Sequence, residues 1–224
     1  MVIYYTALGM LNRFDVNGNE AEVEYHGKKF ELDMPAFIIW TSLMWNVYQY
    51  DDLEKVFEVK CKKYKVIPDF EFDYYMQSLE LMGIIKSGKG CTAITALYTL
   101  LLNLHICPIN YSLIGRVKTF VGSLIKKVPV KIAAQAFEKI KIDNPDERKV
   151  WELICQADLS VSEAICCVVK GITEIEEDSI IEKIYGEKYD YKTIGAYALL
   201  SDDKYKIIDA IVGLYQKKMI IFEN

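Results

Sequence analysis

The fold is decided by one stretch of the first half, LELMGIIKSGKGCT (residues 79–92). Leu79 and Met82 end an apolar stripe at helical spacing, and a short apolar run follows them. Gly88 and Gly90 then supply the residue type that most readily adopts the positive φ angles of a tight turn. The stretch therefore predicts a helix that runs into a strand, a turn and a second strand.

A hairpin and further helices are predicted upstream of this stretch. The segment EAEVEYHGKKFEL (residues 20–32) alternates apolar and polar side chains around Gly27, as a half-exposed β-hairpin does. Asp33 and Pro35 then favour the start of a first helix. A second helix follows, and a third is expected over residues 69–83.

The C-terminal stretch YKIIDAIVGLYQKKMIIFEN (residues 205–224) repeats the change from helical spacing to a short apolar run. Between the two copies, residues 94–104 predict a nearly all-apolar helix that Pro108 stops, and His105 is expected to lie within an apolar helix. We expect a mainly α fold with small β-hairpins (α+β), in which two winged-helix-like units are joined by a helical linker. The expected parts are an N-terminal winged-helix-like domain with a leading β-hairpin (1–111), a basic helical linker (112–143) and a C-terminal helical domain (144–224).

The segment FELDMPAFIIWTSL (residues 30–43) joins a Phe-x-Leu strand to an Ile-Trp-x-x-Leu helix. This pattern resembles the small winged-helix domains of the peptide-recognition (PqqD-like) type. The positions that match are Phe30, Leu32, Ile39, Trp40 and Leu43. The resemblance implies that a peptide binds by strand addition along the edge strand of the hairpin and the third helix. The peptide contacts expected there are Val23, Tyr25, Tyr74 and Gln77.

Charge is distributed unevenly along this chain of net charge −5. Residues 113–141 carry seven basic side chains and one acidic one, whereas the third predicted helix has neither lysine nor arginine. DNA binding draws its non-specific affinity from basic groups on phosphates, so any DNA contact must be local. The side chains that could contact DNA or an acidic partner are Lys60, Lys62, Lys63, Lys86, Lys89, Arg116, Lys118, Lys126 and Lys127. The basic segment could equally face acidic lipid or the acidic C-terminal half.

Catalytic and metal-binding patterns are weak in this sequence. The segment GIIKSGK (residues 83–89) fits part of a phosphate-binding loop, but Gly90 replaces the serine or threonine that the motif requires. His26 and His105 are the only histidines, and neither has cysteine or carboxylate partners at ligand spacing. The six cysteines show no CxxC pair, which favours free thiols in a reducing compartment. We expect no enzymatic activity, no metal and no cofactor.

These observations favour a non-catalytic binding or regulatory protein. The first hypothesis is a protein or peptide adaptor, and the alternative is a DNA-binding transcriptional regulator that uses the turn and linker lysines, as a monomer or a homodimer. The N-terminal segment MVIYYTALGMLNRFD (residues 1–15) lacks the layout of a secretory signal, and no long uncharged apolar run follows. We therefore expect a cytoplasmic protein without membrane insertion.

Overall fold

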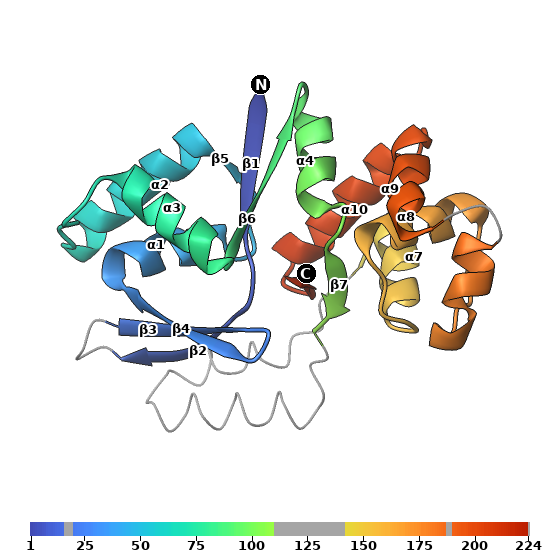
Figure 1. Ribbon diagram of the computed structural model, residues 1–224, viewed down its shortest axis with the longest axis horizontal. Helices are drawn as coiled ribbons and strands as arrows, with labels where there is room; N and C mark the ends of the chain where they lie inside the picture. The colour runs from blue at the N-terminus through green and yellow to red at the C-terminus, as the bar shows by residue number, and fades with distance from the viewer. Residues whose placement is uncertain (16–19, 110–141, 187–189, 224) are drawn as a thin grey trace.

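The computed structural model describes residues 1–15, 20–109, 142–186 and 190–223 (Figure 1). The fold is mixed α and β, with small antiparallel sheets among the helices, as the sequence predicts. Nearly all of the basic linker expected at residues 112–143 lies outside the described residues, and so do Arg116, Lys118, Lys126 and Lys127.

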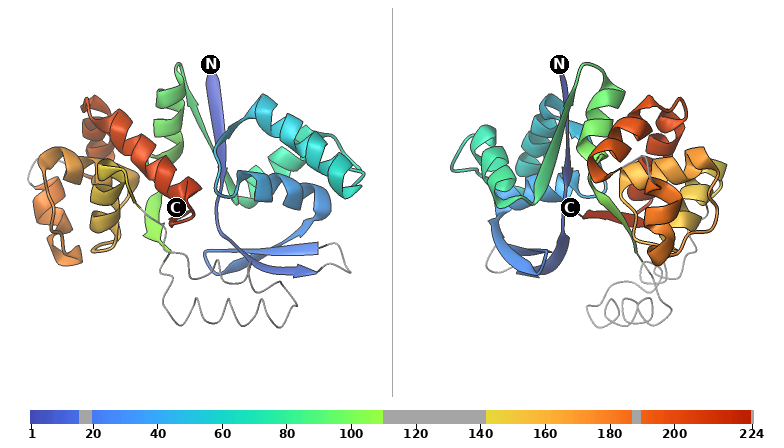
Figure 2. Two further views of the ribbon diagram at one scale, coloured as in Figure 1. Left: turned by 180° about the vertical axis from the view of Figure 1, so that it is seen from behind. Right: turned by 45° about the vertical axis from the view of Figure 1, so that its right-hand side comes forward.

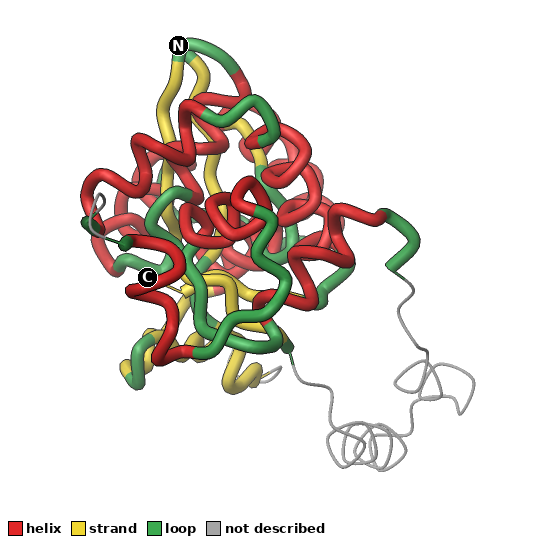
Figure 3. Tube along the Cα trace, turned by 90° about the vertical axis from the view of Figure 1, so that its right-hand side faces the viewer, coloured by secondary structure: helices red, strands yellow, loops and turns green. Residues whose placement is uncertain are grey.

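The first half is built on a sheet whose central strand comes from the N-terminus. Strand β1 (Val2–Ala7) pairs antiparallel with β5 (Tyr48–Gln49) on one side and with β6 (Ile85–Gly90) on the other. Figure 3 shows the N-terminus, where this strand begins, at one end of the described part of the molecule. The segment VIYYTA is rich in β-branched and aromatic residues, which suit a half-buried pleated surface.

Three helices pack around this sheet, as the sequence predicts. They are α1 (Met34–Leu43), α2 (Tyr50–Tyr64) and α3 (Phe72–Met82). The carboxylate of Asp33 accepts a 2.9 Å hydrogen bond from the backbone N–H of Ala36, so Asp33 caps α1 as expected. Gly83 ends α3 with a left-handed φ of 74°, a conformation that costs glycine little.

A separate three-stranded sheet is inserted between β1 and α1. Its order is β2 (Met10–Asp15), β3 (Glu20–Tyr25) and β4 (Lys28–Asp33), with β3 in the centre. His26 and Gly27 both have positive φ, at 50° and 69°, and close the two-residue turn between β3 and β4. The predicted hairpin is therefore confirmed, but it gains a third strand, β2, that the sequence analysis does not anticipate.

The second half contains a smaller sheet. Strand β7 (His105–Pro108) pairs antiparallel with β8 (Ile220–Glu223), and His105 also forms an isolated bridge with Ser160. Thus β7 stands between Ser160 and β8 as β1 stands between β5 and β6. The helices of this half are α7 (Pro145–Ile154), α8 (Val161–Lys170), α9 (Tyr191–Leu200) and α10 (Lys204–Gln216), with short helical turns at η2 (Glu177–Ser179) and η3 (Ile181–Tyr185). Because β7 belongs to the range expected for the first domain, the sheet of the second half draws on both ranges.

The predicted strand-turn-strand at residues 83–92 is wrong. Strand β6 is one unbroken strand that leads through Thr92 into α4 (Ala93–Leu101). Gly88 and Gly90 lie two residues apart and so share the face of β6 on which α4 packs. A Cβ on Gly88 would lie 2.2 Å from the backbone nitrogen of Leu100. The two glycines therefore permit a close strand–helix approach, not a turn.

The helix expected over residues 94–104 ends early. Helix α4 stops at Leu101, and His105 lies on strand β7, so its placement in an apolar helix is wrong. Figure 2 shows α4 between the first sheet and the helices of the second half. Its apolar side chains explain this position, because Leu100 and Leu101 are fully buried in the core of the second half.

Tyr215 of α10 joins the two halves. Its side chain is 1% exposed and its ring lies 5.5 Å from that of Trp45, centroid to centroid. The hydroxyl of Thr6 donates to the Tyr215 hydroxyl at 3.1 Å, and the Tyr215 hydroxyl donates to the backbone carbonyl of Leu43 at 3.3 Å. One aromatic side chain thus satisfies polar groups of β1 and α1 while it fills an apolar contact between the halves.

Candidate peptide-binding edge

Strand β2 is an exposed sheet edge. It pairs with β3 on one side, and no other described strand pairs with it. Met10, Leu11 and Phe14 are 46%, 45% and 41% exposed, respectively, which is high for large apolar side chains on a strand. An exposed edge strand presents unpaired backbone N–H and C=O groups to any extended chain that approaches it.

The inner face of the small sheet is apolar and continues past the helix that covers it. Ala21 and Val23 of β3 are buried there, and Phe14 and Leu11 are their respective cross-strand partners on β2. Helix α1 packs on β3 and β4, and the Phe14 ring stacks on Phe37 of α1 at 5.0 Å between centroids. Leu11 and Phe14 therefore extend the apolar face beyond the cover that α1 provides.

The outer face of the same sheet is mainly acidic. Its carboxylates are Glu20, Glu22 and Glu24 on β3 and Glu31 and Asp33 on β4. The Nζ of Lys29 lies 3.0 Å from the Glu22 carboxylate and, together with a hydrogen bond from Asn12, lowers the pKa of Glu22. Among the described residues, no ion pair involves Glu20, Glu24 or Glu31. The outer face thus presents a negative potential beside β2.

Strand β2 contains a register shift that changes which of its side chains lie on the same face of the sheet. The pairing with β3 jumps between Leu11 and Arg13, so Asn12 is an extra residue. Bulges of this kind bend an edge strand and re-aim its side chains. As a result, Leu11 and Phe14 share the inner face although they are three residues apart.

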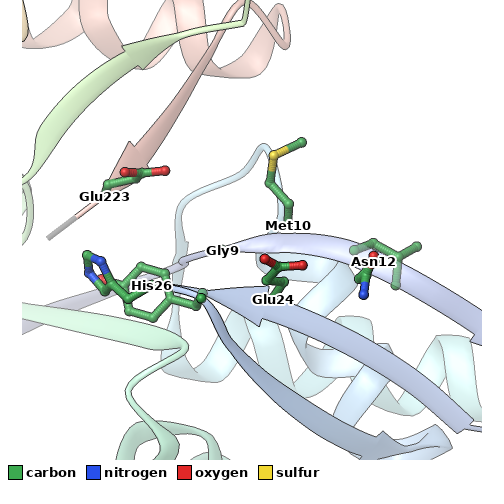
Figure 4. A pocket seen from close by; sticks show the side chains of 9 residues that line it. Gly9, Met10, Asn12, Glu24, His26 and Glu223 are labelled. Carbon is green, nitrogen blue, oxygen red and sulfur yellow. The ribbon is translucent and has the colours of Figure 1, made fainter.

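A cleft of about 560 Å³ opens at the Met10 end of the edge. Figure 4 shows Glu223 of β8 on one side of it and Met10 and Glu24 on the other, with His26 near Glu223. The residues that line the cleft are Gly9, Met10, Leu11, Asn12, Glu24, Tyr25, His26, Gly27 and Glu223. The cleft therefore joins the exposed edge to the C-terminal strand and has the volume of a ligand site.

Gly9 shapes the chain where the cleft begins. Its φ is +82°, and a Cβ at this position would lie 2.6 Å from the carbonyl oxygen of Glu24. Glycine is therefore required by both the backbone angle and the close approach. The turn at Gly9 directs the chain out of the first sheet and into β2.

The residues expected at the peptide edge are only partly brought together. Val23 is fully buried on the central strand, so its assignment to an edge is wrong. Tyr25 ends the same strand and lines the cleft. Tyr74 and Gln77 are exposed on α3, but α1 lies between α3 and the small sheet (Figure 1). One flat surface that includes both β3 and α3 does not exist.

The expected basic contacts occupy separate parts of the first half. Lys62 and Lys63 are exposed near the end of α2, whereas Lys60 is half-buried there and its Nζ donates to the Ser42 hydroxyl at 2.8 Å. Lys86 and Lys89 lie on strand β6, so their placement on a wing turn is wrong. Burial lowers the pKa of both Lys60 and Lys86, which disfavours the charged form that phosphate binding requires.

All six cysteines have free thiols. Cys61, Cys166 and Cys167 are buried, Cys107 is half-buried, and Cys91 and Cys155 are exposed. Burial raises the pKa of Cys167 to about 12 and that of Cys166 to about 11, so these thiols stay protonated at neutral pH. Within the described ranges, no three His, Cys, Asp or Glu side chains gather in a way that could hold a metal ion.

The signal that could reveal β2 is present in the sequence but short. The segment MLNRFD alternates imperfectly, because the bulge at Asn12 puts Leu11 and Phe14 three residues apart. A period of two is the usual mark of a strand, and this spacing breaks it. The edge that forms the candidate site therefore escapes a reading by periodicity.

Comparison of the chain with protein-family models, with curated proteins and with solved structures finds no match in any of the three. Among the described helices, none has both the length and the apolar character needed to cross a bilayer.

Proposed function

We propose that this protein is a non-catalytic binding protein that takes up an extended segment of a partner protein as an additional strand beside β2. The observation that carries the proposal is the open edge of β2, with three large apolar side chains more than 40% exposed. Soluble proteins usually protect such an edge with charge, proline or a covering element. An edge kept open and apolar is instead typical of strand-addition sites.

The geometry supports both parts of strand addition. The outer edge of β2, which pairs with no other described strand, can supply main-chain hydrogen bonds, which provide affinity for any extended segment. Leu11 and Phe14 supply apolar contacts for alternate side chains of the added strand, which provide selectivity. The sequence predicts peptide binding at the hairpin of this sheet, and the exposed edge of β2 supports binding at β2 in place of β3.

We also propose that the two halves are winged-helix-like units that lack a wing. Each half has a central strand supplied from its N-terminal side and helices followed by a closing strand. In this arrangement the strand expected from a wing hairpin is replaced by β1 in the first half and by β7 in the second. The small sheet that carries β2 is then an addition to a common frame.

A matched pair of variants tests the proposed function. Linear peptides that bind the full chain would first be selected from a displayed random library. The selected peptides would then be titrated by calorimetry against the wild type, Leu11→Lys and Leu81→Lys. A lysine on an edge strand opposes strand addition, so Leu11→Lys should weaken binding about tenfold or more. Leu81 is 89% exposed on α3, so Leu81→Lys makes the same chemical change away from the edge and should leave affinity unchanged.

Two results would overturn the proposal. One is a selection that yields no binding peptide, and the other is an equal loss of affinity in both variants. Circular dichroism and thermal unfolding of each variant show whether the fold is retained, and Phe14→Lys supplies a second edge variant if Leu11→Lys unfolds.

DNA binding is the second candidate, and the exposed Lys62 and Lys63 near the end of α2 favour it. Against it, α3 exposes Asp73 and Glu80, which phosphates would repel. Fluorescence anisotropy with mixed-sequence duplex DNA at low and near-physiological salt separates the candidates. Binding with a steep salt dependence would favour the regulator, and no binding at low salt would exclude it.

A further inference from the structure

We propose that the partner segment places a lysine or arginine side chain in the cleft between β2 and β8, while its neighbouring apolar side chains contact Leu11 and Phe14. This inference rests on the proposed strand addition and names the chemistry of the segment that would be added. The partner is therefore an extended segment in which basic and apolar residues alternate.

The charge of the cleft selects a cation. Glu24 comes from the small sheet and Glu223 from the last strand of the chain, and both line the same opening (Figure 4). Glu223 interacts with the Cys107 thiol, whose pKa burial raises to about 12, and Glu24 takes part in no ion pair among the described residues. Lys29 lies near enough to Glu24 for an electrostatic interaction but pairs with Glu22. Two carboxylates at a concave site with partly apolar walls raise the local concentration of cations.

The shape of the cleft suits a long side chain with a charged end. Its volume of about 560 Å³ exceeds that of one side chain and leaves room for bound water. Met10 and the Tyr25 ring supply apolar and aromatic walls. The centroid of the Tyr25 ring lies 4.1 Å from that of the His26 ring. The methylene stem of lysine or arginine packs on such walls while the charged end reaches the carboxylates.

The pleat of an added strand separates the two kinds of side chain. Met10 is the cross-strand partner of Glu24 on the outer face, whereas Leu11 and Phe14 face inward with Val23 and Ala21. Side chains of a strand beside β2 alternate between these faces. A basic residue that points outward near Met10 therefore has neighbours that point inward, toward Leu11 and Phe14.

The charges along β2 and β3 favour one end of the edge for the bound cation. Arg13 lies on the outer face, opposite Glu22, and repels a cation placed beside it. Glu24 and Glu223, at the other end of β2, have no lysine or arginine among the residues that line the cleft. The cation therefore belongs at the Met10 end.

Capped peptides of alternating threonine and valine, about nine residues long, provide the probe. Their central outward residue is arginine, glutamine or glutamate, and each peptide is titrated against the full chain by calorimetry. The arginine peptide should bind about tenfold more tightly than the glutamine peptide, as a charge-assisted hydrogen bond allows. The glutamate peptide should bind more weakly than either.

Two double variants locate the effect. Glu24→Gln with Glu223→Gln removes both cleft carboxylates and should abolish the preference for arginine. Glu20→Gln with Glu31→Gln removes the same charge from the far part of the outer face and should preserve it. These four side chains are exposed, so the substitutions should leave the fold intact.

The possible results test three claims separately: the preference for a basic residue, its location in the cleft, and strand addition itself. Equal affinity for the three peptides overturns the preference for a basic residue and leaves strand addition standing. An equal loss of preference in both double variants assigns it to the general field of the sheet and overturns the cleft. Failure of all three peptides to bind contradicts the proposed strand addition itself.

Discussion

The two halves of the molecule differ in how they use polar and apolar side chains. In the first half β1 lies between β5 and β6, whereas in the second half β7 pairs with β8 and forms a single bridge to Ser160. Among the described residues, the buried charged side chains, Glu147 and Glu163, both belong to the second half. The first half instead exposes the apolar edge of β2.

The buried charges of the second half are internally satisfied. Glu147 pairs with Lys217, and Glu163 accepts hydrogen bonds from the backbone of Ser160 at 2.7 Å and from the Tyr185 hydroxyl at 2.7 Å. Buried charges with complete partners rigidify a structure but leave nothing for a ligand. The proposed site therefore uses the exposed edge of the first half together with Glu223 of β8, and not the buried charges of the second half.

The largest expected effect breaks the joint between the halves. Tyr215→Ala should lower the free energy of unfolding by about 3–5 kcal/mol, because it removes a buried aromatic ring. Tyr205→Ala on the same helix, where the side chain is 48% exposed, should cost less than about 0.5 kcal/mol. Urea unfolding measures both values. Equal costs would contradict a joint at Tyr215.

A smaller effect tests the close contact between β6 and α4. Gly88→Ala should destabilise the protein by about 1–3 kcal/mol, because the new Cβ would overlap the backbone of Leu100. Ser87→Ala changes the neighbouring position on the same strand without added bulk and serves as the control. If thermal unfolding of the two variants is the same, Gly88 has no packing role and a turn at this position returns as an explanation.

The caps of the second half provide the next test. Ser160→Ala removes a buried cap of α8 that also forms a capping box with Glu163, and should cost about 1 kcal/mol or slightly more. Asn144→Ala removes an exposed cap of α7 and should cost less, because water can replace the lost hydrogen bond. Chemical unfolding compares them. A larger loss for Asn144→Ala would contradict the internal satisfaction of the second half.

The smallest effect concerns the thiols. Cys91, exposed at the end of β6, should react with a thiol reagent at once, whereas Cys166 and Cys167 should react only as the protein unfolds. Their raised pKa keeps them protonated in the folded state, so the free energy of unfolding falls as pH rises above about 8.5, where unfolded thiols ionise. Mass spectrometry after timed labelling identifies the order. Labelling of Cys167 at the rate of Cys91 would contradict its burial.

Local chemistry predicts most of the helices and the central hairpin. Asp33 caps α1 as expected, and such a cap is recognisable in a sequence because its side chain acts on the next few residues. The roles of Gly88 and Gly90 escape prediction, because glycine serves both turns and close packing and only the position of α4 decides between them.

The candidate site depends on pairings between distant parts of the chain. Strand β1 pairs with β6, with partners such as Val2 and Gly90 far apart in the sequence, and the cleft joins residues 9–12 and 24–27 to Glu223. No local pattern contains the information that Val23 is central and β2 is the edge. The sequence therefore predicts the antiparallel hairpin of this sheet, whereas the identity of its edge strand is known only from the three-dimensional structure.

Hydrogen–deuterium exchange on the full chain, with and without the arginine-containing threonine–valine peptide, tests the central claim most directly. The account predicts that the peptide slows exchange at the backbone amides of residues 10–14, because an added strand pairs with them. Exchange in α8 and α10 should stay unchanged. Protection at the turn between α2 and α3, with none in β2, would contradict strand addition at this edge.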